Sequence, residues 1–129
     1  MTQEREDNLS DERRSAVLYL RSGPRDFLAQ HEACRHKGQR LGVTITKEFI
    51  DPRSAGSGSD RPALQHLLKY LAERPVKYVI VWNPSRLSRN RADYTAITRR
   101  IEQTGATLVF ADRDSQSDAV MALVSGGAW

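Results

Sequence analysis

The sequence predicts an α/β fold of three layers, an open and mostly parallel sheet of four to five strands with helices on both faces. Short apolar runs of strand length alternate with amphipathic stretches of about 15 residues, the pattern of consecutive βαβ units. Several of these runs are apolar at nearly every position, as in parallel strands that are buried on both faces. A chain of 129 residues, 39% hydrophobic and 28% charged, has the size and composition of one globular domain.

In the first half of the chain, the apolar run at 16–20 predicts a strand, which Ser22-Gly23-Pro24 ends. Residues 27–41 read as a helix with an apolar side. Residues 43–49 alternate and are rich in β-branched side chains, which indicates a second strand. The glycine- and serine-rich stretch at 51–59 is then typical of a loop.

In the second half, Asp60 is the expected N-cap of a helix with Pro62 in its first turn. An apolar stripe at helical spacing follows, formed by Leu64, Leu67, Leu68 and Leu71. Residues 76–82 predict a buried strand that Asn83-Pro84 ends, residues 89–103 a helix, and residues 107–111 the last strand.

Charge and cysteine content exclude several classes of protein. The net charge is +4, but residues 1–14 carry three arginines against five acidic residues, so the remainder carries +6. Sixteen of the 20 basic residues are arginine, whose planar guanidinium binds phosphate in a bidentate manner. No apolar run approaches the roughly 20 residues of a membrane span, and the polar N-terminus does not resemble a secretory signal. One cysteine, Cys34, forms no internal disulfide, so we expect a cytoplasmic protein without a membrane partner.

Arginine and hydroxyl side chains are expected to gather where the strands end. Ligands of open α/β sheets bind beyond the carboxyl ends of the strands. Arg21 and Ser22 are expected to follow the first strand, and Asp51 the second. The third strand is followed by Ser85, Arg86, Ser88 and Arg89. These residue types in one place favour a phosphate-binding site.

Other phosphate-binding classes lack their motifs. The sequence Gly56-Ser57-Gly58-Ser59 has no lysine followed by serine or threonine, so it is no Walker loop. No GxGxxG follows the first strand, and no acidic pair stands there to hold magnesium as in a signalling receiver. A flavodoxin-like domain with another ligand remains a third interpretation.

Neither a metal nor a cofactor is expected. His31, His36 and His66 read as helix-face residues rather than ligands, and Cys34 as a core residue. Without a metal, the positive charge for phosphodiester chemistry must come from arginines, which gives a mechanistic role to the set Arg21, Arg61, Arg86 and Arg89.

Motifs in three regions, in order along the chain, resemble the catalytic domain of the serine recombinases, the resolvase/invertase family. The resemblance spans about residues 16–113, and its third motif is close to the family's W-x-x-D-R-L-S-R. The matching pieces are Tyr19-Leu20-Arg21 with Ala29-Gln30 through Ala33-Cys34-Arg35; then Asp51 through Ser54, Gly56 and Asp60-Arg61-Pro62-Ala63-Leu64; and then Val81-Trp82-Asn83-Pro84-Ser85-Arg86-Leu87-Ser88-Arg89.

The resemblance implies a mechanism and a set of roles. In this family a serine two residues after the first arginine attacks the DNA phosphate, forming a 5′-phosphoserine link that is later reversed. By resemblance, Arg21, Arg61, Arg86 and Arg89 would clamp the phosphate backbone of DNA. Tyr19, Gln30 and Asp51 would support the site.

Three departures bear on activity. Gly23 stands at the position of the family's nucleophile, with Ser22 one residue earlier as the candidate substitute. Ser85 replaces the motif's aspartate by a hydroxyl that does not titrate in the useful range. Family members continue into a long dimerisation helix and a DNA-binding domain, so we expect residues 114–129 to be the truncated start of that helix or an unstructured tail.

The expectation is therefore a disordered polar tail at 1–14, a resolvase-type catalytic domain at 15–113, and strand cleavage that is impaired or lost. The alternative is a non-catalytic module that binds the DNA backbone or acts as a partner of a recombinase. A homodimer and a heteromer with a full-length recombinase both stay open.

Overall fold

The computed structural model describes residues 14–53 and 61–113. Three predicted segments lie outside the described residues. They are residues 1–13 of the N-terminal tail, residues 54–60 with most of the glycine-serine loop and Asp60, and the segment 114–129. No helix in the described part is long and apolar enough to cross a membrane.

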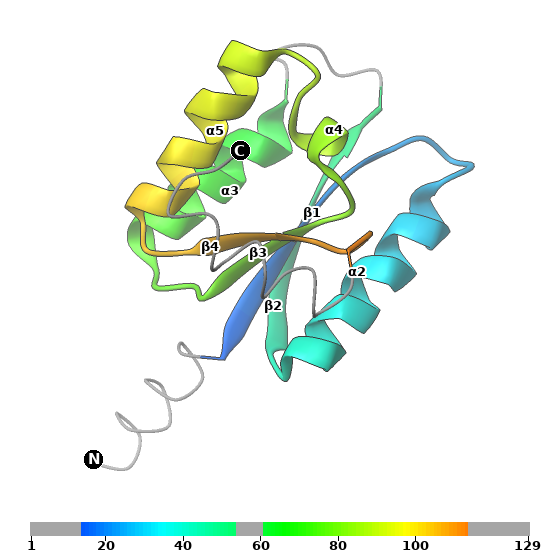
Figure 1. The fold of residues 1–129 in the computed structure, drawn as a ribbon, viewed down its shortest axis with the longest axis horizontal. Helices are drawn as coiled ribbons and strands as arrows, with labels where there is room; N and C mark the ends of the chain where they lie inside the picture. Colours follow the sequence, from blue (N-terminus) through cyan, green and yellow to red (C-terminus); the bar gives the residue numbers. More distant parts are fainter. Residues whose placement is uncertain (1–13, 54–60, 114–129) are drawn as a thin grey trace.

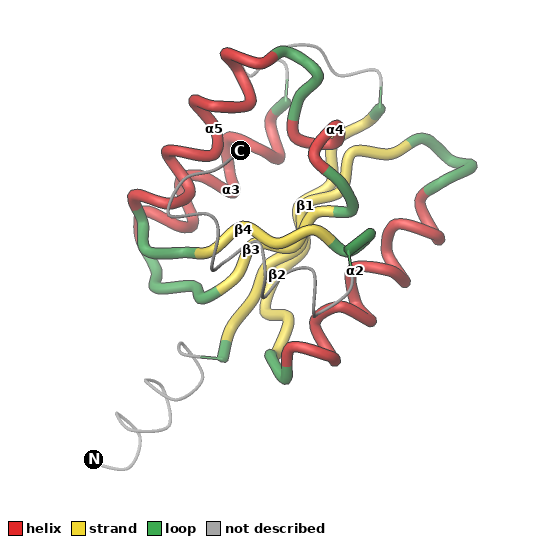
Figure 2. Tube along the Cα trace, viewed as in Figure 1, coloured by secondary structure: helices red, strands yellow, loops and turns green. Residues whose placement is uncertain are grey.

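Four parallel strands form one sheet in the order β2-β1-β3-β4 (Figures 1 and 2). The strands are β1 (Ser15–Ser22), β2 (Thr44–Pro52), β3 (Tyr78–Val81) and β4 (Thr107–Phe110). β1 lies inside the sheet, and its residues from Ser15 to Leu20 are all buried, which explains its unbroken apolar run. The predicted three-layer α/β fold is confirmed.

Helices cover both faces of the sheet (Figure 1). α2 (Phe27–Leu41) packs on one face, over a core formed by Ala16, Leu18, Leu20, Cys34, Ile80 and Val109. α3 (Pro62–Glu73) and α5 (Arg91–Gln103) cover the other face, over a larger core that includes Val17, Tyr19 and Val79. The predicted stripe on α3 is confirmed, since its four leucines are buried there.

Two strands extend further than predicted. β1 and β2 stay paired through Arg21 with Asp51 and Ser22 with Pro52, so these residues belong to the ladder instead of following it. Conversely, β3 is shorter than the predicted strand at 76–82. The extension matters because the pleat of a strand fixes the direction of each side chain.

The predicted start of the helix at 89–103 was wrong by two residues. A separate short helix, α4 (Pro84–Leu87), follows β3, and α5 begins at Arg91. Asn90 caps α5, since its side-chain Oδ1 accepts the backbone N–H of Asp93 at 2.9 Å. The cap explains why α5 begins after Asn90 and not at Arg89.

Candidate phosphate-binding site

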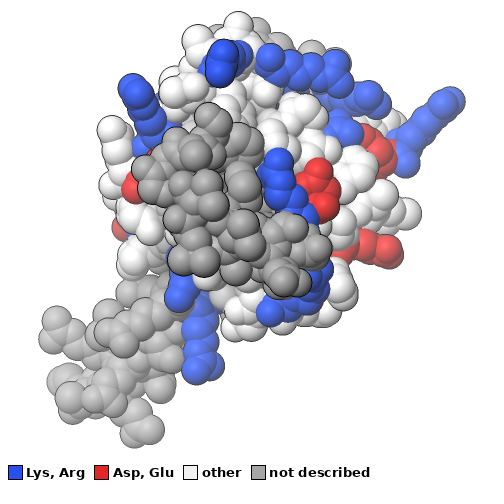
Figure 3. All heavy atoms as spheres, in the orientation of Figure 1, with Lys and Arg blue, Asp and Glu red and all other residues white. Residues whose placement is uncertain are grey.

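A pocket of about 490 Å³ lies at the carboxyl ends of the strands. It is lined by four arginines and four further polar residues, namely Arg21, Arg53, Arg86, Arg89, Ser85, Ser88, Asn90 and Asp93. Lys and Arg side chains gather along the upper edge of Figure 3, above the region of α4 and the start of α5 in Figure 1. The lining holds four guanidinium groups and one carboxylate, a composition that favours an anionic ligand.

The pleat of β1 directs Arg21 and Ser22 to opposite faces of the sheet. Val17 and Tyr19 belong to the core under α3 and α5, whereas Leu18 and Leu20 belong to the core under α2. Arg21 continues the first series and lines the pocket. Ser22 continues the second series, is 8% exposed and is not among the lining residues. The structure therefore does not bring Ser22 into the arginine pocket.

Gly23 has room for a side chain. A Cβ at this position would lie 4.0 Å from Arg53 Cδ and 4.0 Å from Asp26 Oδ1, which is ordinary van der Waals contact. Arg53 itself lines the pocket. A side chain at the position that carries no hydroxyl would therefore contact a residue that lines the pocket.

Arg86 is held by three contacts. Its Nη2 lies 3.0 Å from Asp26 Oδ2, and its Nη1 donates to the backbone oxygen of Arg21 at 3.3 Å. The guanidinium carbon lies 5.0 Å from the centroid of the Trp82 ring, a cation–π contact. Gln30, wholly buried on α2, also donates to the Arg21 oxygen, at 3.2 Å. These contacts join β1, α2 and α4 around the end of the first strand.

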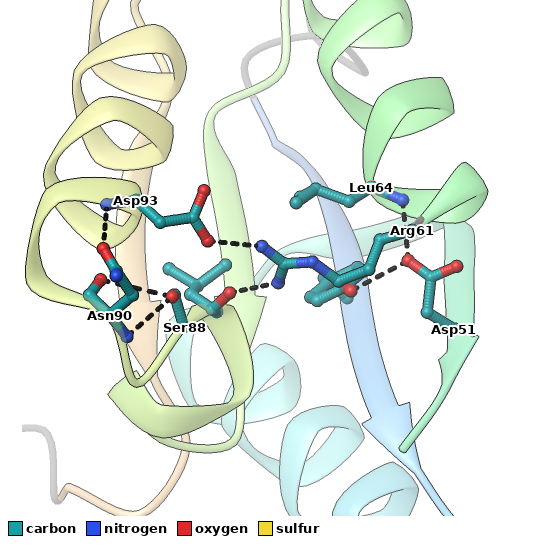
Figure 4. A network of polar contacts seen from close by, with 8 residues as sticks. Asp51, Arg61, Leu64, Ser88, Asn90 and Asp93 are labelled. Atoms are coloured by element: carbon teal, nitrogen blue, oxygen red, sulfur yellow. Dashed lines mark hydrogen bonds and ion pairs between the residues drawn. The ribbon is translucent and has the colours of Figure 1, made fainter. Parts of the chain in front are cut away.

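Arg61 is placed differently from the other three predicted arginines, because it is wholly buried and does not line the pocket. One guanidinium nitrogen donates to the backbone oxygen of Leu87, and the other lies 2.8 Å from Asp93 Oδ2 (Figure 4). Arg61 therefore ties the start of α3 to the α4–α5 segment and positions residues that do line the pocket.

Asp51, near the end of β2, caps the N-terminus of α3. Its carboxylate accepts the backbone N–H groups of Ala63 and Leu64, each at 2.9 Å, and the hydroxyl of Tyr19 at 2.8 Å. Figure 4 shows the contact between Leu64 and Asp51. The predicted cap, Asp60, lies outside the described residues, and the observed N-cap residue, Arg61, makes no side-chain cap. Burial, together with the Asp51 carboxylate, raises the pKa of Tyr19 far above its usual value, so Tyr19 stays a neutral donor.

The comparison with known families decides the identity. The protein-family model described as "Resolvase, N terminal domain" matches residues 16–126 of this sequence. The chain belongs to the resolvase family. No curated protein matches the sequence.

Solved resolvase-type domains share the fold. The C-terminal catalytic domain of ISC1926 TnpA, an IS607-like serine recombinase, is 21% identical with a TM-score of 0.65, over 86% of this chain and 78% of that one. The N-terminal catalytic domain of TP901-1 integrase is 16% identical with a TM-score of 0.68, over 87% and 92%. A resolvase-family site-specific recombinase from Streptococcus pneumoniae is 18% identical with a TM-score of 0.64, over 86% and 85%.

In this resolvase domain a serine, Ser85, stands at the position of the motif aspartate, so this position carries no carboxyl group. Ser85 is exposed and donates to Asn83 Oδ1 at 2.6 Å. Ser88 lies beside it in the pocket, where its hydroxyl accepts the N–H of Asn90 at 3.0 Å (Figure 4). The carboxylate nearest to Arg86 comes instead from Asp26.

The histidines and the cysteine lie outside this site. His31 pairs with Glu48 at 2.8 Å between α2 and β2, and among the described residues no group of His, Cys, Asp and Glu forms a metal site. Cys34 is buried in the core, as predicted, and burial raises the pKa of its thiol to about 12. The resolvase pocket is lined by arginines, two serines, Asn90 and Asp93.

Sequence reasoning missed four residues of this resolvase site, which are Asp26, Arg53, Asn90 and Asp93. Arg53 follows the second strand directly, so the strand-end rule could have included it. Asn90 is a favourable N-cap residue three positions before Asp93, which is a local signal for the true start of α5. Asp26 and Asp93 gave no such signal, because their arginine partners are distant in the sequence.

Proposed function

We propose that this resolvase-family domain binds the phosphate backbone of DNA through its arginine pocket, and that its capacity for strand cleavage is impaired or lost. One observation carries the proposal: four arginines line the pocket, while Ser22 is buried on the other face of β1 and Gly23 offers no hydroxyl.

The residues of the pocket suit a phosphodiester better than a small neutral ligand. Arg53 and Arg89 are exposed, so their guanidinium groups are accessible to a large polyanion. Ser85 and Ser88 add hydroxyl groups, and Asn90 adds an amide. Contacts of this kind fix a protein on the DNA backbone and carry no base specificity.

Two features support impaired cleavage. The Ser22 hydroxyl would need to cross from one face of the sheet to the other to attack a phosphate in the pocket, and β1 remains paired with β2 at this residue. A misplacement of about 1 Å already costs about 100-fold in rate. In addition, no acid occupies the Ser85 position, which removes a group for proton transfer.

DNA binding is tested by the anisotropy of a fluorescein-labelled duplex. Arg89→Ala should weaken binding about five- to tenfold at low salt, the loss of one charge-assisted phosphate contact. Arg99→Ala removes the same charge from an exposed position in the second half of α5 and should leave the affinity within about twofold. Equal effects of the two substitutions would reject the pocket as the binding site.

Cleavage is tested separately, with a nicked duplex and a gel that retains covalent protein–DNA links. The proposal expects no link that depends on Ser22. A 5′ attachment that is present in the wild type and absent in Ser22→Ala would show that Ser22 is a working nucleophile and would overturn this half of the proposal.

A recombinase partner is the second candidate function. A resolvase domain that binds DNA without cutting could pair with a second copy or with a full-length recombinase, and a DNA partner agrees with the expected cytoplasmic location. Co-purification with a tagged active recombinase, at a defined stoichiometry in size-exclusion chromatography, is the result that this candidate requires.

A further inference from the structure

We infer that Asp26 is an internal competitor of phosphate for Arg86, so that it lowers the affinity of the pocket for DNA. The inference rests on the proposed DNA-backbone function and specifies how that site is regulated. It is carried by the placement of the Asp26 carboxylate, the geometry of its ion pair with Arg86, and the position of Arg86 in the pocket.

The Asp26 carboxylate does not serve its own helix. Asp26 is the N-cap residue of α2, a position where an aspartate usually accepts a backbone N–H of the first turn, yet its side chain makes no such bond. Its Oδ1 instead accepts the N–H of Gly23 at 2.9 Å, and its Oδ2 lies 3.0 Å from Arg86 Nη2. The carboxylate is therefore directed across the β1–α2 turn toward α4.

Arg86 is thereby already neutralised at one edge of its guanidinium. Its other terminal nitrogen donates to the Arg21 oxygen, and its Nε is buried with no hydrogen-bond partner among the residues that the structure describes. Because Arg86 lines the pocket, a phosphate that enters must share or displace the Asp26 contact.

The ion pair is placed so that it can open. The side chains of Arg86 and Asp26 are 15% and 18% exposed, so neither partner is wholly buried, as Arg61 is in its pair with Asp93. Asp26 Oδ2 is buried and has no hydrogen-bond partner among the described residues, so its contact with Arg86 lacks the geometry of a charge-assisted hydrogen bond. A phosphate offers Arg86 such hydrogen bonds. Asp26 thus reduces the affinity for phosphate without blocking the pocket.

The direct test is Asp26→Asn, which removes the charge and keeps an oxygen to accept the Gly23 N–H. We expect labelled duplex DNA to bind about two- to fivefold more tightly. The plot of log K against log salt should become steeper by up to about 0.9, the slope of one added phosphate contact. Glu32→Gln is the matched control, an exposed carboxylate on the same helix, and should change neither quantity beyond the general effect of one lost charge.

A double-mutant cycle assigns the effect to Arg86. In an Arg86→Ala background, Asp26→Asn should give no gain beyond that of Glu32→Gln, because the group that Asp26 neutralises is gone. A thermal unfolding curve accompanies each variant, and Asp26→Ser, with another good N-cap residue, replaces Asp26→Asn if the latter does not fold.

The outcomes separate the two proposals. If the wild type binds DNA and Arg89→Ala weakens it, but Asp26→Asn binds equally or less tightly than Glu32→Gln, Asp26 is not a competitor and the binding function stands. If neither the wild type nor Asp26→Asn binds DNA in a salt-dependent manner, the proposed function fails and this inference fails with it.

Discussion

The guanidinium of Arg61 lies 2.8 Å from the carboxylate of Asp93, joining the first residue before α3 to the first turn of α5. Arg61 is wholly buried, although its sequence motif suggested a residue that faces phosphate. The pair fixes the α4–α5 segment, which carries Ser88, Arg89 and Asn90 into the pocket.

We predict that Arg61→Ala lowers the free energy of unfolding by about 3 kcal/mol, because it removes the partner of Asp93 and leaves the Leu87 oxygen unsatisfied. Urea unfolding followed by circular dichroism measures the change. Arg99→Ala, on an exposed face, should stay within about 0.5 kcal/mol. A similarly small loss for Arg61→Ala would mean that the buried pair does not stabilise the fold.

Asp51→Asn should destabilise the start of α3. The carboxylate accepts three hydrogen bonds, and an amide has one acceptor oxygen for them, so we expect a loss of about 1–3 kcal/mol. Hydrogen exchange should show reduced protection of the N–H groups of Ala63 and Leu64 in particular. Tyr19→Phe is the control, because it removes only the Tyr19 bond to Asp51. In that variant we expect hydrogen exchange at the Ala63 and Leu64 amides to stay unchanged.

Stability should fall at alkaline pH. Burial raises the pKa of Cys34 to about 12 and also raises the pKa of Tyr19 well above its usual value. Since both groups ionise more easily in the unfolded chain, their contribution is complete below pH about 9 and is lost as the pH rises toward 12. Cys34→Ala should flatten the decline of the unfolding free energy between pH 9 and 12. An equally steep decline in this variant would contradict the assignment.

Gly23→Ser should fold normally. The nearest atoms to an added Cβ are 4.0 Å away, so we expect a change in unfolding free energy below about 1 kcal/mol. Gly42→Ala is the comparison variant, and we expect it to be the more destabilising of the two. Nothing lies within 4 Å of a Cβ added at Gly42, but its φ of +70° is unfavourable for residues other than glycine. A larger loss for Gly23→Ser than for Gly42→Ala would show that the β1–α2 turn has no room for a hydroxyl at the family's nucleophile position.

Local patterns were sufficient for the layers of the fold but not for the ends of its elements. The apolar run of β1 and the leucine stripe of α3 are properties of neighbouring residues, so they could be read directly. The extension of β1 through Ser22 depends on its pairing with Pro52, 30 residues later, which no local pattern contains. For that reason the sequence left the direction of Ser22 open, whereas the ladder assigns it to the face opposite Arg21.

The residues of the candidate site that follow strand ends could be predicted, whereas those placed by distant partners could not. Strand ends placed Arg21, Arg86 and Arg89 together, and the pocket contains all three. Arg61 was misplaced because its partners, Leu87 and Asp93, are 26 and 32 residues away in the sequence. The cap of α3 was assigned to the adjacent Asp60, while the carboxylate that performs this role comes from Asp51 on β2.

The central claim is that the arginine pocket binds the DNA backbone, and the salt dependence of duplex binding tests it most directly. For the wild type, log K should fall linearly with log salt between about 50 and 200 mM, by about 0.9 for each phosphate neutralised. The double variant Arg53→Ala/Arg89→Ala should lower that slope by nearly two such units, uniformly across unrelated DNA sequences. A slope that is flat in the wild type, or equal in the double variant, would contradict the account.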